Sequence, residues 1–132
     1  LAGIHCCGNT DWPMLMETQL DILNFDAFGY MNTILIYKKE IEAFLKRGGY
    51  LAWGIVPTTD SINEVTVNGL FHKLESAVEE LVNKGIEKKL IIENSLITPS
   101  CGTGSLPIDE AEKSMNMTHD LSIMIKDRYG IT

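Results

Sequence analysis

Basic residues are scarce in this sequence of 132 residues, which has 11 Lys and Arg against 18 Asp and Glu and a formal net charge of −7. Nucleic-acid backbones and anionic membrane surfaces attract basic clusters, so neither is expected as the main partner. The sequence also lacks an apolar run of about 18–20 residues, the length that a membrane-spanning helix needs. We therefore expect no nucleic acid and no membrane among the partners of this chain.

Cysteine is sparse, with three residues at Cys6, Cys7 and Cys101. Their odd number, together with the lack of a signal-peptide pattern, favours reduced thiols and predicts a cytoplasmic protein. The sequence does not start with methionine, and its first five residues are typical of a strand already under way. We expect residues 1–132 to form a single domain that is the C-terminal fragment of a larger protein.

Four apolar runs predict strands at residues 1–6, 25–30, 50–56 and 95–98. They show little polar alternation, which is typical of parallel strands covered on both faces. A helical pattern follows each run, and caps, glycines and apolar spacing predict helices over about 11–22, 34–47, 67–84 and 107–129. The alternation of strand and helix predicts an α/β fold with a parallel sheet.

Four βα units are half of the eight that close a (β/α)8 barrel. An open four-stranded sheet, a fragment of a barrel, or two copies that complete one barrel would each accommodate them. We favour the C-terminal half of a (β/α)8 TIM barrel, because the polar and metal-binding residue types come just after strands, where barrel active sites lie. The open edges then predict a homo-oligomer or association with a missing N-terminal half.

The chemistry of the sequence is concentrated in three residues at strand ends. In an extended strand His5 and Cys7 point to the same face and Cys6 to the other, where it is expected to pack. Cys101 ends the last predicted strand, and imidazole with thiolates is a ligand set that suits zinc. The alternative is that Cys7 and Cys101 are small buried hydrophobic residues and His5 a hydrogen-bonded rim residue.

Two segments carry a family resemblance: residues 3–12, Gly-Ile-His-Cys-Cys-Gly-Asn-Thr-Asp-Trp, and residues 98–102, Thr-Pro-Ser-Cys-Gly. They resemble the C-terminal barrel of cobalamin-independent methionine synthases, and equally the methylcobalamin:coenzyme M methyltransferases and the wider uroporphyrinogen-decarboxylase-like superfamily. The similarity covers nearly the whole chain, as the C-terminal half of the family's barrel. It implies that His5, Cys7 and Cys101 bind zinc, which holds the acceptor thiol.

One feature of the methionine synthases is missing. Those enzymes add a Glu ligand at the end of the next strand, a region that has no Glu in this sequence. Asp26 is a candidate replacement for that ligand. The departure argues against strict methionine synthase identity and is compatible with the broader class of zinc-thiol enzymes.

The function implied is that of a methyltransferase, in which zinc activates a small thiol acceptor for methylation from a folate or a corrinoid donor. A free thiol has a pKa of about 8.5, and zinc binding gives the thiolate at neutral pH. Asp60 is the candidate catalytic residue, placed to hold a substrate amine or the zinc-bound His. Asn9, Asp11 and Thr58 are candidate substrate-binding residues. A cap for the next helix suits Asp60 equally, and a helix cap suits Asp11 better than a place in the pocket.

Two other classes of function stay open at the level of the sequence. The first is a non-catalytic half-barrel that binds a metal or a partner protein. The second is a decarboxylase-like enzyme of the same superfamily that needs no metal, in which the cysteines are incidental.

Overall fold

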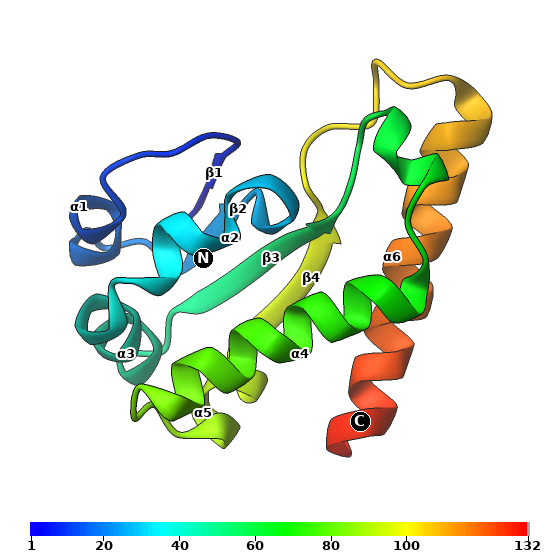
Figure 1. Ribbon diagram of the computed structural model, residues 1–132. Coiled ribbons are helices and arrows are strands. Elements are labelled where there is room, and N and C mark those ends of the chain that lie inside the picture. Colours follow the sequence, from blue (N-terminus) through cyan, green and yellow to red (C-terminus); the bar gives the residue numbers. More distant parts are fainter. Residues whose placement is uncertain (132) are drawn as a thin grey trace.

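The computed structural model describes residues 1–131. Its elements are β1 (Gly3–Cys6), α1 (Trp12–Glu17), β2 (Ile22–Phe25), α2 (Ala27–Leu35), α3 (Lys38–Lys46), β3 (Tyr50–Val56), the 3-10 helix η1 (Asp60–Asn63), α4 (Val67–Asn83), α5 (Lys88–Glu93), β4 (Ser95–Pro99) and α6 (Ile108–Tyr129). The four strands form one sheet in the order β1-β2-β3-β4, and every pairing is parallel (Figure 1). The predicted α/β fold with a parallel sheet is confirmed.

The apolar core lies on one face of this sheet. Side chains in register across parallel strands point the same way, and the row of Cys6, Phe25, Trp53 and Ile97 packs into or against the core. Phe25 lies between two Trp rings, with ring centroids 6.0 Å from Trp12 and 5.4 Å from Trp53. Burial of these aromatic side chains ties α1 to β2 and β3.

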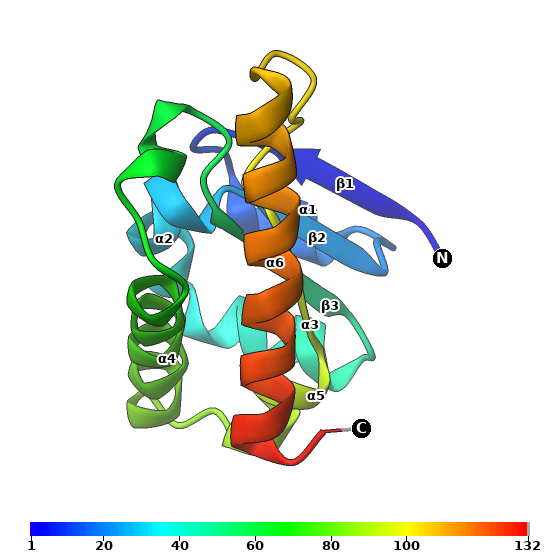
Figure 2. The ribbon, with the colours of Figure 1, turned by 90° about the vertical axis from the view of Figure 1, so that its right-hand side faces the viewer.

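The opposite face of the sheet carries a second row, made of His5, Asn24, Ala52 and Leu96. His5 is exposed, Leu96 is 41% exposed, and Ala52 is buried without belonging to the core cluster. In Figure 2, α2 and α4 lie on one side of the molecule and β1 lies on the other, away from them. The apolar runs are typical of strands covered on both faces, but within residues 1–131 the core cluster covers one face alone.

The strand boundaries follow the sequence closely at two places. The predicted strand at 50–56 is β3 without change, and the strand at 95–98 is β4 with Pro99 added. The strand predicted at 25–30 is wrong, since only Phe25 lies in β2 and α2 begins at Ala27. A short apolar run does not distinguish a strand from the buried start of a helix, and here the side chain of Asp26 begins the helix by accepting from the Gly29 amide.

The helices also differ from the predicted pattern. The segment 34–47 is divided between α2 and α3, and α1 ends at Glu17, well before residue 22. The last helix begins after Pro107 and ends at Gly130, whose φ of 67° allows the left-handed cap that a side chain would disfavour. Among residues 1–131, no helix combines the length and the apolar character that crossing a bilayer requires.

Candidate metal centre

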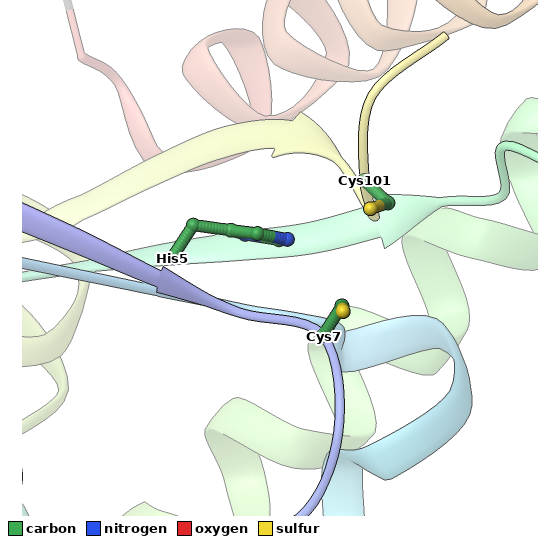
Figure 3. A group of neighbouring side chains, drawn as sticks. All are labelled: His5, Cys7 and Cys101. Carbon is green, nitrogen blue, oxygen red and sulfur yellow. The ribbon is translucent and has the colours of Figure 1, made fainter. Parts of the chain in front are cut away.

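Three potential metal ligands meet at the carboxyl end of the sheet. One ligand atom from each of His5, Cys7 and Cys101 lies within 4.8 Å of the other two (Figure 3). His5 belongs to β1, Cys7 follows β1 directly, and Cys101 comes two residues after β4. All three side chains are exposed, so they are accessible to an ion and to a substrate. The structure thus brings together the residues that the sequence predicts as ligands, and the cluster could hold a metal ion.

The alternation of side chains along β1 places two of these ligands. Cys7 is exposed on the side of His5, whereas Cys6 is partly buried and contacts the core. The Cys6 thiol lies 3.7 Å from the Gly8 carbonyl oxygen, a weak contact that keeps it away from the cluster. The prediction that Cys6 packs on the helix side is confirmed.

Cys101 reaches this cluster because the chain after β4 crosses over β3 toward β1. Three strand spacings separate β1 from β4, which is roughly 14 Å in a flat sheet. The chain is held by the Ser100 amide, which donates to the Val56 carbonyl at 2.8 Å, and by a buried contact of 3.2 Å between the hydroxyls of Thr58 and Ser100. These bonds fix the residue that precedes Cys101.

Gly54 makes room for this close approach. A Cβ atom at Gly54 would lie 2.5 Å from the Phe25 carbonyl oxygen, 2.9 Å from the Ser100 Cα and 3.0 Å from the Pro99 carbonyl oxygen. All three neighbours are backbone atoms, which cannot rotate out of the way as a side chain does. The lack of a side chain at Gly54 is therefore a condition for the position of Ser100 and of Cys101 beyond it.

The donor set fits a borderline-soft ion. Zinc bonds of about 2.0–2.3 Å to nitrogen and sulfur place tetrahedral ligands about 3.5–3.8 Å apart, so the ligand atoms would approach one another by about 1.3 Å at most. Among residues 1–131 no carboxylate joins the cluster. Three protein ligands leave one position open, which is typical of catalytic rather than structural sites.

The candidate replacement ligand Asp26 has another role. Its Oδ1 accepts from the Gly29 amide at 2.7 Å and caps α2. Its charge also acts on Lys73 of α4, where burial lowers the pKa of the ammonium group and the carboxylate of Asp26 opposes that shift. The Asp26 carboxylate therefore caps α2 and acts on Lys73 of α4, and it does not belong to the ligand cluster.

The remaining candidate site residues lie in loops and caps. Thr58 is 8% exposed and its hydroxyl contacts Ser100, so it supports the Cys101 segment. Asp11 caps α1 by accepting from the Met14 amide at 3.0 Å, and Asn9 is exposed in the loop between β1 and α1. Asp60 is exposed at the first position of η1, whose cap is the Thr59 hydroxyl. A role for these residues with a substrate stays a prediction.

Sequence reasoning missed one residue of the site. The side chain that contacts His5 is Asn24, whose Oδ1 lies 2.6 Å from His5 Nδ1. Holding this imidazole is the role considered above for Asp60, and the structure gives it to Asn24. The available signal was a single polar residue in the middle of the apolar segment 22–25, but only the strand register shows that Asn24 is the neighbour of His5.

Comparisons with known proteins add no relative: no protein-family model matches the chain, and no curated protein or solved structure matches it. The evidence for a function is therefore the arrangement of the chain's own residues.

Proposed function

We propose that this chain is the zinc-binding half of a (β/α)8 methyltransferase, which activates a small thiol for methylation by a folate or a corrinoid donor. The observation that carries the proposal is the meeting of His5, Cys7 and Cys101 at the carboxyl end of a parallel sheet, with their ligand atoms within 4.8 Å. This is where catalytic residues lie in barrels of parallel strands. The family resemblance of the two segments that supply these residues points to the same chemistry.

The half-barrel is supported by the arrangement of the sheet. Its four parallel strands follow each other in chain order, the core lies on one face, and within residues 1–131 the outer edges of β1 and β4 are unpaired. In a closed barrel the row that contains His5, Asn24 and Leu96 would face the interior. A complementary set of strands would cover that row and pair with both edges.

The chemistry follows from the ligand types. When bound, zinc supplies a positive charge that favours the thiolate form of a substrate thiol at neutral pH. Two cysteinates and a neutral imidazole balance the ion's charge, so a substrate thiolate adds a net negative charge and stays nucleophilic. The substrate sulfur then forms a bond to the methyl carbon while the bond from that carbon to the donor breaks. The contribution of His5, Cys7 and Cys101 is to orient that sulfur toward the open side.

Metal content tests the first part of the proposal. Reduced protein loaded with zinc or Co²⁺ is expected to retain one ion per chain, and Cys7→Ser and Cys101→Ser to lose it. Cys6→Ser is the matched control, since it changes the adjacent thiol on the opposite face and is expected to bind normally. Wild-type protein that retains far less than one ion per chain, or Cys7→Ser that binds as wild type does, would contradict the site.

A thiol titration tests the second part. Adding a small thiol to the Co²⁺-loaded protein is expected to strengthen the sulfur-to-cobalt charge-transfer band, because a third sulfur joins the ion. Methyl transfer is then measured as S-methyl product with methylcobalamin or methyltetrahydrofolate as donor. If the spectrum of the Co²⁺-loaded protein does not change when the thiol is added, the result would instead support the non-catalytic metal-binding module.

A further inference from the structure

The Asn24 side chain connects His5 to the two strands farthest from it. Its Oδ1 lies 2.6 Å from His5 Nδ1 on β1, and its Nδ2 lies 2.9 Å from the Ala52 carbonyl oxygen on β3 and 2.8 Å from the Thr98 hydroxyl on β4. A single amide thus spans all four strands of the sheet. Its three contacts occupy one acceptor position and both donor hydrogens of the side chain.

These contacts fix which end of the amide faces His5. A backbone carbonyl only accepts hydrogen bonds, so the group of Asn24 that faces Ala52 must be the NH2. The Thr98 hydroxyl accepts the second hydrogen of the same NH2 group. The amide oxygen is therefore the atom directed at the imidazole, and rotating the amide by 180° would place two carbonyl oxygens face to face.

The orientation of the amide decides the tautomer of His5. A neutral imidazole carries its proton on either nitrogen, and the amide oxygen of Asn24 can only accept. The proton must then lie on Nδ1, which donates to Asn24, and Nε2 keeps a free lone pair. Figure 3 shows the ring extending from β1 toward Cys101, with Cys7 beside it. Nε2 is thus the nitrogen left for the cluster.

We propose that Asn24 is a positioning residue that holds His5 in its Nδ1–H tautomer and so prepares Nε2 as a ligand before any ion arrives. The inference rests on the metal site proposed above. Partners of this kind for metal-binding histidines orient the ring, and their loss costs roughly 10–100-fold in metal affinity. The network also ties His5 to the Thr98 segment that leads to Cys101, so the two ends of the ligand set share one support.

The tautomer is measured directly by ¹⁵N NMR of the reduced, metal-free protein at a pH where the imidazole is neutral. The chain has three histidines, and a His5→Gln variant assigns the His5 signals by their loss. The wild-type protein is expected to show the proton on Nδ1. Asn24→Leu, which has a similar volume and no acceptor, is expected to show both tautomers. Asn24→Asp keeps an acceptor and is expected to restore the Nδ1–H form.

Thr98→Val is the matched control, because it removes one of the two partners of the NH2 group and leaves the Ala52 carbonyl to orient the amide. His5 in this variant is expected to keep the Nδ1–H tautomer of the wild type. Asn24→Leu is expected to bind zinc roughly 10–100-fold more weakly. The wild-type measurement needs His5→Gln for the assignment but does not need Asn24→Leu, so it tests the inference even if Asn24→Leu does not fold.

A wild-type imidazole that carries its proton on Nε2 would overturn the inference, as would Asn24→Leu that binds zinc as tightly as wild type. These results differ from a failure of the proposed function. A wild-type chain with the Nδ1–H tautomer and no zinc binding would refute the metal site and leave the hydrogen-bond assignment intact. If the wild type binds zinc and Asn24→Leu binds it equally tightly, whichever tautomer His5 then adopts, only the role of Asn24 is refuted.

Discussion

Gly54→Ala should push β3 away from β2 and from the segment after β4 that leads to Cys101. The added Cβ would lie 2.5 Å from the Phe25 carbonyl oxygen, whereas ordinary contacts begin at 3.4 Å, so the backbone must move by about 0.9 Å. Overpacking of this kind typically costs about 1–3 kcal/mol in the free energy of unfolding. For a chain of this length each kcal/mol lowers the melting temperature by roughly 3–5 °C.

The same displacement should weaken metal binding beyond what lower stability explains. The atoms in the way include Ser100 Cα, one residue before Cys101, so the thiol moves together with the obstruction. We expect the zinc affinity of Gly54→Ala to fall by about tenfold or more, as for other changes next to a ligand. Competition with a coloured chelator measures the affinity, and thermal unfolding followed by circular dichroism measures the stability.

Two control variants separate the loss of stability from the loss of zinc affinity. Gly8→Ala adds the same methyl group next to Cys7, where no heavy atom lies within 4 Å of the new Cβ, and it should change neither quantity. Ile41→Val, at a buried position on α3, should lose about 0.5–1.5 kcal/mol of stability and keep its zinc affinity. Gly54→Ala with wild-type melting and wild-type affinity would refute the account of how Cys101 reaches the site. A loss of stability without a loss of affinity would refute the link between them.

Two further predictions concern carboxylates outside the cluster. The hydrogen bonds of Glu42 with Lys38 and Lys46 lower the pKa of that carboxyl from 4.5 to about 2, so they stabilise the fold above pH 4.5 and this contribution is lost as the pH falls toward 2. Urea unfolding of wild type and Glu42→Gln should therefore differ most at neutral pH and converge toward pH 2, and a constant difference would contradict the assignment. Asp26→Ala should lose about 0.5–2 kcal/mol with the cap of α2 and keep its zinc affinity, because the carboxylate lies on the Gly29 amide. Weaker zinc binding in this variant, measured by the same chelator competition, would restore Asp26 as a ligand.

The chain's local patterns predicted β1 and β4, the strands next to the three candidate ligands, and β3 between β2 and β4. The β3 strand and the end of β4 follow from continuous apolar runs bounded by glycine, proline and serine, and the alternation along β1 correctly separated Cys6 from Cys7. The boundary between β2 and α2 was missed because Phe25 and Ala27 are apolar on both sides of it. The residue that marks the boundary is Asp26, whose side chain caps α2.

Which faces of the sheet are covered was also not predictable from the local pattern of the sequence. Continuous apolar runs are typical of strands buried on both faces, yet β1 is exposed, and its His5 lies on a face that no part of the core cluster reaches. An apolar run indicates that its residues can be buried, but it does not indicate which part of the protein would bury them. The local pattern of the sequence therefore does not determine whether this face is covered.

By itself, the sequence determined which residues are candidate ligands and that they lie at strand ends, since these follow from residue type and from the period of a strand. Only the tertiary structure decided that the ligands meet, because the meeting depends on the missing side chain of Gly54 and on the chain crossing back over β3. The role of Asn24 likewise appears only in three dimensions, since its amide contacts residues 19, 28 and 74 positions away. Hydrogen bonds over such separations leave no periodic trace in the sequence.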